Sequence, residues 1–470
     1  PGGGGAHGDE SDDEFFDAES EPDESRLAIV REDGNGHLIF SDRNLDDMED
    51  EVPSPRNGRV VRTAGHGSAG LPARRTKLPP GRQFSRPAVW TVLKDAVGKD
   101  LSHFTIPILF NEPLSFLQKM VEDLEYSELL DRAARSEDPH MRILLVAALV
   151  VSHYSSTLNR MAKPCNPLLG ETYDITAPEK GSGMRMICEQ VSHHPPVGAV
   201  YAESLDNKIW TYEAAIEVKN KFWGKSLEVF PTGINHVRFP ARGEHYTYQK
   251  AVSCVHNILL GNLWLDNYGD IEIVEQRSGL RCQVKMHKTG WMTDAKNFAA
   301  VHCQVFTPSG APVPAKLSGF WNQYLDLELP HCAPRRLWTV AKRPPSAASN
   351  HFNLTAWGIA LNELPPGESA SSSWSARRHA PTDSRYRPDQ RALELGDVGR
   401  GGEEKTRLEV KQRERRRGRE AAGERWRARW FERTGPPPGE EGEEDWRYKG
   451  GYFERQATPG ERWKDNPDIF

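Results

Sequence analysis

Two adjacent histidines, His193 and His194, lie in the segment with the most distinctive chemistry in this sequence, Glu-Gln-Val-Ser-His-His-Pro-Pro at 189–196. Each proline fixes its own φ angle, and the residue before a proline is pushed out of the helical region. The histidines are therefore predicted to lie in a stiff, non-helical segment where a strand ends. A strand end or turn can direct both rings toward one ligand, whereas neighbours on a regular strand point to opposite faces. Two half-protonated imidazoles beside cations would form an anion site, and phosphate is the anion that this arrangement favours.

Two other roles for the histidine pair follow from the residues alone. The pair could ligate a metal, but the sequence contains no His-Glu-x-x-His motif and no third ligand at a suggestive spacing. The pair could also be buried and structural, which is the usual role of a lone histidine. Residue type and spacing do not separate this structural role from an anion site.

A second polar segment surrounds Pro164. Lys163 and Asn166 bracket this proline in a turn punctuated by proline and glycine. A lysine offers a point charge to phosphate, and an asparagine amide can donate to phosphate or inositol oxygens. The simpler alternative is a tight turn before a strand, with a solvated lysine.

A third charged set, Lys405, Glu409 and Arg413, repeats at every fourth residue. On a helix these residues form one stripe that spans about 12 Å. Glu409 can pair with both cations and hold them in place. The alternative is an ordinary salt-bridged face in solvent. The neighbouring run Arg415–Arg417 is interpreted as surface charge that could face an anionic membrane leaflet.

Composition limits the classes of protein that this chain can belong to. The 470 residues carry a net charge of −6, which argues against a general nucleic-acid binder and leaves room for one large domain plus tails, or for two domains. The six cysteines are widely spaced without a Cys-x-x-Cys pair, as expected for reduced thiols. The longest aliphatic run, 143–151, is shorter than the ~20 residues that a spanning helix needs. The glycine-rich, acidic first residues are unlike a signal peptide.

Patterning predicts a disordered tail followed by a mixed α and β domain. Residues 1–73 are rich in Gly, Asp, Glu, Ser and Pro and have few apolar runs, so they are predicted to be disordered. Apolar spacing predicts helices over 114–135 and 138–160, with Asp138 as N-cap and Pro139 in the first turn. Closely spaced β-rich runs with short turns then predict an antiparallel sheet or barrel. These runs are 209–218, 226–230, 236–239, 246–249, 271–274 and 281–286.

The last third of the chain is predicted to contain segments of several different kinds. Strands are not assigned between 287 and 350. Residues 366–380 are Ser-rich and are predicted to form a loop, and 402–433 are strongly charged with helical character. The tail 446–470 contains several aromatic residues and is predicted to pack back onto the domain.

Four motifs in order resemble the oxysterol-binding protein family over about residues 74–470. The resemblance implies an α+β fold: a large antiparallel, incomplete β-barrel that encloses a lipid tunnel, with an N-terminal lid and helices and a C-terminal helical subdomain. It also implies the short form, which has no pleckstrin-homology domain before the lipid-binding domain. The motifs are 189–196, Lys163–Thr172, Phe110–Leu117, and 387–391 followed by 403–409.

The resemblance also assigns roles to residues of this chain. It implies that a phosphoinositide headgroup binds Lys163, Asn166, His193, His194, Lys405, Glu409 and Arg413. The family's lid corresponds to about 84–109 here. The resemblance implies that the lid and sterol contacts are Trp90, Leu101, Ile106 and Leu109.

A pair of phenylalanines, Phe15 and Phe16, lies within the acidic tail. The segment 14–20 is similar to the FFAT motif, two phenylalanines in an acidic tract, which docks to VAP proteins of the endoplasmic reticulum. Acidic flanks would steer the peptide to a basic surface, and the phenylalanines would anchor it. Ser20 stands where an acid is common, and a merely solvating tail is the alternative. The predicted docking residues are Glu14, Phe15, Phe16, Asp17 and Ala18.

The function that the resemblance implies is lipid transfer without catalysis. A sterol or oxysterol and a phosphatidylinositol phosphate would occupy one tunnel in turn, with no cofactor and no metal. The chain would be cytoplasmic, peripheral at contact sites of the endoplasmic reticulum, and in contact with anionic membranes such as the plasma membrane or lipid droplets. A lipid sensor that acts through partners shares this site. A hydrolase would need a nucleophile, and the sequence has no Gly-x-Ser-x-Gly elbow.

Overall fold

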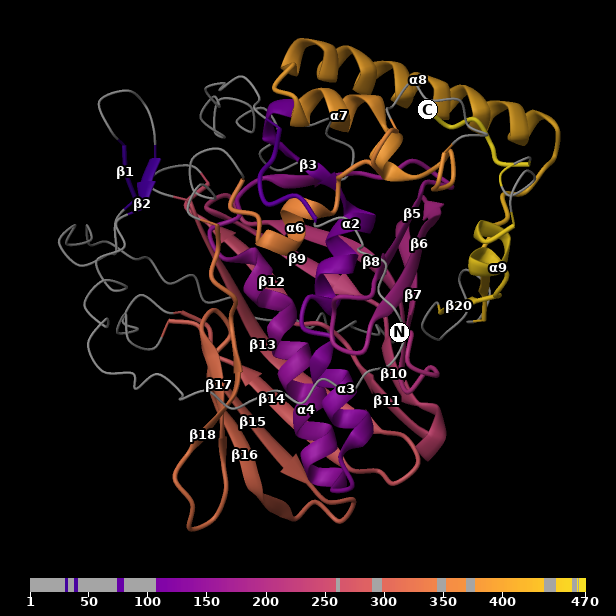
Figure 1. Cartoon of the computed structure of the whole chain (residues 1–470). Helices are drawn as coiled ribbons and strands as arrows, with labels where there is room; N and C mark the ends of the chain where they lie inside the picture. The colour runs from indigo at the N-terminus through magenta and orange to yellow at the C-terminus, as the bar shows by residue number, and fades with distance from the viewer. Residues whose placement is uncertain are drawn as a thin grey trace, which may run out of the picture. The chain divides into compact units, whose positions relative to one another are not determined.

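The computed structural model of the chain is shown in Figure 1. It divides into two compact units, Pro1–Ser54 and Pro55–Phe470, and each is described by itself. None of the helices in the described part of the chain is long and apolar enough to cross a membrane. The backbone of 30–32 and 38–40 is described, and the fully described residues are 74–79, 107–258, 263–289, 298–344, 352–368, 377–434, 445–458, 463 and 465–470.

The first unit contains one antiparallel pair of strands, β1 (Val30–Glu32) and β2 (Leu38–Phe40). Both strands contain β-branched or aromatic residues, which favour extended backbone. These six residues differ from the disorder predicted for 1–73. The remainder of that prediction lies outside the described residues.

The second unit is built on one sheet of 14 strands. Every pairing within this sheet is antiparallel, and its main path runs from β18 to β5. No pairing between β5 and β18 is found in the described ranges, so the sheet forms an incomplete barrel. The strands are β5 (Thr172–Ala177), β6 (Met184–His193), β7 (Pro196–Ser204), β8 (Thr211–Phe222), β9 (Ser226–Thr232), β10 (Asn235–Phe239), β11 (Glu244–Tyr248), β12 (Val252–His256), β13 (Trp264–Glu275), β14 (Arg281–Met286), β15 (Ala300–Phe306), β16 (Pro312–Phe320), β17 (Tyr324–Glu328) and β18 (Arg335–Thr339).

The α+β class and the large antiparallel sheet are confirmed, and each predicted β run coincides with a strand. The unassigned stretch 287–350 contains four further strands, β15 to β18. In β15 the buried residues alternate with more exposed ones: Val301, Cys303 and Val305 are buried. Pro312 and Pro314, the first and third residues of β16, weaken the sequence pattern of that strand, because proline cannot donate a ladder hydrogen bond.

Helices pack against the sheet where the sequence predicts them. The predicted stretches become α2 (Phe116–Val121), η5 (Glu122–Leu124), α3 (Glu128–Arg135), α4 (Pro139–Ser152) and η6 (His153–Thr157). Asp138 caps α4 by accepting a hydrogen bond from the His140 amide at 2.9 Å, as predicted. Every residue of α4 from Arg142 onward is buried, because the helix runs along β13 to β16 (Figure 1).

The C-terminal part of the chain lies outside the main sheet. The long helix α8 (Val398–Ala421) lies across one end of the sheet in Figure 1, beside α7 (Pro388–Glu394). The predicted helix over 402–433 therefore begins earlier and ends at Ala421, since a left-handed residue, Gly423, follows and 431–433 form strand β19. Smaller elements are β3 (Asn111–Ser115), β4 (Lys163–Cys165), η4 (Ile108–Phe110), η7 (Pro240–Arg242), α6 (Ala356–Ala360), η10 (Ser384–Tyr386), β20 (Trp446–Tyr448) and α9 (Tyr452–Gln456).

The aromatic tail packs back onto the domain, as predicted. Trp430, Tyr452, Phe453 and Trp463 are buried in one cluster with apolar side chains of β6 and β7. Ile187 of β6 belongs to this cluster, whereas its neighbour Met186 belongs to the main core. Both faces of β6 are therefore covered.

A buried ion cluster joins the segments before and after the first helices. Arg160 Nε donates to Glu112 Oε2, and its Nη1 donates to Glu122 Oε1, both at 2.6 Å. Lys119 Nζ donates to the Glu122 carboxylate at 2.6 Å. Burial raises the pKa of Glu112, whereas Arg160 and Lys119 outweigh burial and lower the pKa of Glu122. Arg160 and Lys119 together thus balance the charge of two buried carboxylates, Glu112 and Glu122.

We predict that Arg160→Met lowers the free energy of unfolding by about 3–5 kcal/mol, because it leaves the buried Glu112 without its counter-ion and Glu122 with Lys119 alone. The measurement is chemical denaturation at neutral pH. Arg336→Met is the matched control, since Arg336 pairs with Asp326 near the surface and should contribute under ~1 kcal/mol. Equal losses in the two variants would contradict the assignment.

Candidate functional site

The two adjacent histidines lie in the tight turn between β6 and β7. His193 is the last residue of β6 and pairs with Pro196, the first residue of β7. A β-bulge between Gln190 and Ser192 interrupts the ladder just before the turn, and bulges of this kind redirect side chains. The ring centroids of His193 and His194 are 4.7 Å apart. The predicted position at a strand end is confirmed, and the turn brings both rings to one place.

Helix α8 contacts this turn through Gln412. The Gln412 amide oxygen accepts the Leu169 N–H at 2.8 Å, and its amide nitrogen lies 2.7 Å from His193 Nε2. Gln412 was not among the predicted site residues. Its spacing of seven residues from Lys405 would have placed it on the same face of a helix.

The charge state of His193 differs from the predicted one, in which both imidazoles are half-protonated. Burial, followed by repulsion from His194, Arg416 and Arg387, lowers the pKa of His193 to about 4. His193 is therefore neutral at pH 7. The sequence shows the neighbouring cations of a histidine only when they are close along the chain, so this shift could not be predicted.

The turn that carries Lys163 is fixed by a parallel pairing of β4 with β3. Asn111 Nδ2 donates to the Lys163 carbonyl oxygen at 3.1 Å. Partial desolvation and repulsion from Lys405 lower the pKa of Lys163, although its side chain keeps exposed surface. The fold therefore brings these two lysines, far apart in sequence, within electrostatic reach of each other.

Arg387 holds the other end of this turn. Its buried guanidinium donates to the Asn166 carbonyl oxygen at 2.6 Å and to Glu171 Oε2 at 3.0 Å. It also donates to Asp389 Oδ1 at 2.7 Å. Burial disfavours the charge, but Asp389 and Glu171 raise the pKa of Arg387. The exposed side chain of Asn166 is thereby presented from a turn whose backbone is fixed.

The predicted stripe on α8 is present in part. Lys405 Nζ lies 3.1 Å from Glu409 Oε1, while Arg413 is exposed one turn further on. Arg416, predicted to lie off the site, is one of the cations that lower the pKa of His193. It follows Gln412 by four residues, so both lie on one face of the helix. Arg416 therefore joins the cations of the site.

One buried leucine anchors the middle of this charged helix. Leu408 packs with Leu168 of the Lys163 turn and with Ile469 near the end of the chain. Lys411 Nζ also donates to Asp468 Oδ2 at 2.9 Å. The last residues of the chain thus pack against both α8 and the turn that carries Lys163 and Asn166, and they hold the two together.

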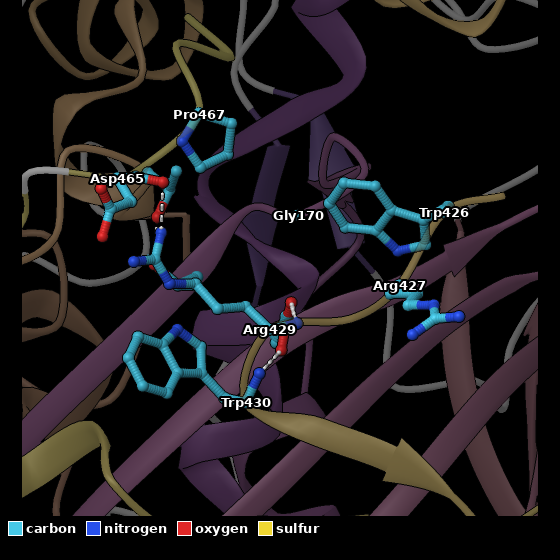
Figure 2. Close-up of a pocket in the computed structure, with 10 residues that line it drawn as sticks. Gly170, Trp426, Arg427, Arg429, Trp430, Asp465 and Pro467 are labelled. Atoms are coloured by element: carbon cyan, nitrogen blue, oxygen red, sulfur yellow. Dashed lines mark hydrogen bonds between the residues drawn. The ribbon is translucent and has the colours of Figure 1, made fainter. Parts of the chain in front are cut away.

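A cavity of about 300 Å³ lies on the outer side of β6, between that strand and the C-terminal segment. Figure 2 shows the Trp426 ring across this cavity from the side chains of Arg429 and Pro467. Trp426 Nε1 donates to the Val191 carbonyl oxygen at 3.0 Å. Gly170 lies against the same ring, and a Cβ added there would approach Trp426 to 2.7 Å. The cavity therefore borders the histidine turn.

Glu189 fastens the C-terminal segment to β6. Its two carboxylate oxygens accept the backbone N–H groups of Arg429 and Trp430, at 2.7 and 2.8 Å. Burial raises the pKa of Glu189 to about 7. The first residue of the 189–196 motif thus has a structural role, and the histidines follow it on a strand that is held from both sides.

Several predicted residues cannot be placed. The docking segment with Glu14 to Ala18, and the lid residues Trp90, Leu101 and Ile106, lie outside the described residues. Leu109 is half-buried in η4. The helix α8 reaches this region through Gly401, where a Cβ would approach Ile108 to 3.0 Å.

One group of side chains in the described ranges has ligand atoms close enough to hold a metal ion: Asp174, His379 and Asp383. Its hydrogen bonds are already formed, because Asp174 accepts from His379 at 2.8 Å and from Tyr452 at 2.7 Å. Arg385 pairs with Asp383 at 2.9 Å and supplies the positive charge. This group fastens the C-terminal segment to β5.

Comparison with known proteins identifies the family. The sequence model for oxysterol-binding protein matches residues 88–457. The chain belongs to the oxysterol-binding protein family. It is 36% identical to mouse oxysterol-binding protein-related protein 3 over 97% of this chain and 51% of that protein. It is 39% identical to Arabidopsis thaliana oxysterol-binding protein-related protein 1B over 84% of this chain and 77% of that protein.

The matches establish the family without singling out one member, and the chain spans about half the length of several curated relatives. Solved structures agree with the fold. The Osh1 ORD domain in complex with cholesterol superposes with a TM-score of 0.72 at 34% identity, over 85% of this chain and 94% of that one. The Saccharomyces cerevisiae Osh3 ORD in complex with PI(4)P superposes with a TM-score of 0.72 at 30% identity. The match covers 85% of this chain and 99% of that one. The family comprises lipid-binding and lipid-transfer proteins and not enzymes.

We predict that Glu189→Gln loosens the C-terminal segment. A neutral amide offers one acceptor atom where the carboxylate offers two, so one backbone N–H loses its acceptor and the other keeps an uncharged one, at a cost of about 1.5–3 kcal/mol. Hydrogen exchange at the amides of Arg429 and Trp430 should accelerate while the amides of β13 and β14 stay protected. Glu217→Gln on β8, which is separated from β6 by β7, is the control and should leave both regions unchanged. Unaltered exchange in Glu189→Gln would show that the carboxylate does not hold the segment.

Proposed function

We propose that this chain transfers lipids between membranes by binding a sterol and a phosphoinositide in turn, without covalent chemistry. The observation that carries the proposal is the convergence of cationic and N–H donor groups from three distant segments. Lys163, His193 and Lys405 come from β4, the end of β6 and α8. Lys163 and Lys405 lie within electrostatic reach, and the Gln412 bridge from α8 reaches His193.

The electrostatics of the site favour a ligand with more than one negative charge. Lys163 and Lys405 repel each other, and Arg416 adds a third cation beside His193. A phosphate between such cations removes the repulsion and gains charge-assisted hydrogen bonds. A phosphorylated inositol headgroup also has hydroxyls that suit Asn166. The Osh3 ORD, which has this fold, is described in complex with PI(4)P.

The apolar part of the ligand is proposed to lie inside the incomplete barrel. The inner core of the sheet is lined by apolar side chains, and a large barrel can enclose a hydrophobic ligand. The Osh1 ORD is described in complexes with cholesterol and with ergosterol. A sterol has no phosphate, so the polar site would select the second lipid and leave the first unaffected.

We predict that replacing His193 and His194 together by Ala reduces phosphoinositide extraction at least about tenfold, because each lost hydrogen bond to a charged group is worth about 1.5–3 kcal/mol. Sterol extraction should be retained. The measurement is transfer of each lipid between donor and acceptor liposomes of defined composition. The control replaces another histidine pair, His287 just after β14 and His302 in β15, whose ring nitrogens are 2.9 Å apart. Unchanged phosphoinositide extraction in the first variant, or equal effects in both, would contradict the site.

The proposal extends to where the transfer takes place. The acidic segment 14–20 is proposed to dock to VAP proteins of the endoplasmic reticulum, and the exposed Arg417 to face an anionic membrane. The chain would then be cytoplasmic and peripheral at membrane contact sites. The similarity of Glu14 to Ala18 to the VAP-docking motif supports this part, and the barrel does not depend on it.

We predict that Phe16→Ala weakens binding to the isolated VAP domain strongly even at low salt, because the aromatic anchor supplies most of the buried area of such a peptide. Replacing Asp12 and Asp13 by Asn should instead slow association and make it less sensitive to salt. A pull-down and association kinetics measure these effects. Lipid extraction in solution should be the same in all variants. If the VAP domain retains the Phe16→Ala variant as well as the wild-type protein, the docking role of the tail is contradicted and the tail only adds solvated charge.

A further inference from the structure

The hydrogen bonds of Gln412 determine the orientation of its amide. The backbone N–H of Leu169 can only donate, so the Gln412 atom 2.8 Å away must be the carbonyl oxygen. The amide NH2 group is then the one that lies 2.7 Å from His193 Nε2. An amide NH2 group can only donate. His193 Nε2 must therefore accept and cannot carry a proton while this bond exists.

This orientation has a consequence for the other ring nitrogen. A neutral imidazole carries one proton, so an accepting Nε2 places the proton on Nδ1. In the described part of the chain, His193 Nδ1 is buried and has no hydrogen-bond partner. A buried N–H without an acceptor costs about 1–3 kcal/mol. An anionic oxygen of a bound ligand would remove this cost if it displaced the atoms that cover Nδ1.

We propose that Gln412 is a positioning residue that holds His193 as the neutral imidazole with its proton on Nδ1, so that His193 offers a phosphate an N–H donor and no charge. The proposal rests on the proposed phosphoinositide site for its ligand, but the position of the proton is a property of the protein alone. The positive charge of the site then comes from other groups, among them Lys163, Lys405 and Arg416.

The surroundings of His193 favour the same protonation state. His194 from the turn, Arg416 from α8 and Arg387 from the segment before α7 all act against a positive charge on His193, in addition to burial. The Gln412 NH2 group adds a short-range effect, because protonation at Nε2 would bring two donors together. With the pKa of His193 at about 4, the neutral form persists through the physiological range.

The direct test is NMR of the full chain with 15N-labelled histidine. The ring nitrogens of His193, identified by their loss in His193→Ala, should show a protonated Nδ1 and an unprotonated Nε2 at pH 7. In Gln412→Glu a carboxylate replaces the NH2 donor, so the proton should move to Nε2 and the pKa of His193 should rise by about 1–3. Glu414→Gln, an exposed neighbour on α8, is the control and should leave both unchanged. A proton on Nε2 in the wild-type protein, or an unchanged ring in Gln412→Glu, overturns the proposal.

A second measurement concerns the ligand. The ratio of phosphoinositide affinity between the wild-type protein and His193→Ala should stay constant from about pH 5.5 to 8, because a neutral donor does not titrate in this range. Liposomes that contain PI(4)P are the probe. A ratio that increases as the pH falls through ~6.5 would mean that His193 binds as a cation, and would overturn the proposal. Complete absence of PI(4)P binding by the wild-type protein, with the proton still on Nδ1, would instead refute the proposed function and leave the role of Gln412 standing.

Discussion

Burial of the Arg387 guanidinium between Glu171 and Asp389 joins two segments that are distant in sequence, 163–172 and 387–389. A buried charge costs several kcal/mol unless it is paired and hydrogen-bonded. Arg387 meets this requirement with two carboxylates and with the Asn166 carbonyl oxygen. Asn166 and Glu171 come from the segment between β4 and β5, and Asp389 comes from α7. The turn is therefore fixed relative to the helix pair, and the positions of Lys163 and Lys405 follow from it.

The candidate site combines cations with a neutral histidine, and these groups have different electrostatic properties. Lys163 and Lys405 are held close despite their repulsion, which a multiply charged ligand relieves. His193 is kept neutral by burial and by the cations around it. A neutral N–H donor adds direction without adding repulsion. Such a site is expected to discriminate a phosphorylated headgroup from a sterol hydroxyl more by charge than by shape.

The C-terminal segment is part of the site although it lies outside the barrel. Glu189 holds it by two backbone N–H groups, and Trp426 donates to Val191 two residues before the histidine pair. Ile469 packs under α8 beside Leu408. The strand that ends in the histidine turn is thus supported on both faces, which limits the freedom of the imidazoles. Rigid support of this kind places binding groups accurately.

The sequence by itself determined the class of fold, the strand that ends at His193, the capped helix at Asp138 and the family, because these depend on local patterns and on motifs. It singled out Lys163, His193 and Lys405, which lie in segments that the fold brings toward one another. Only the tertiary structure decided the neutral state of His193, its contact with Gln412, its proximity to Arg416 and the boundaries of α8. The strands between 287 and 350 could also be assigned only from the tertiary structure. Each of these depends on groups that approach from distant parts of the chain, and burial and charge are summed over neighbours in space.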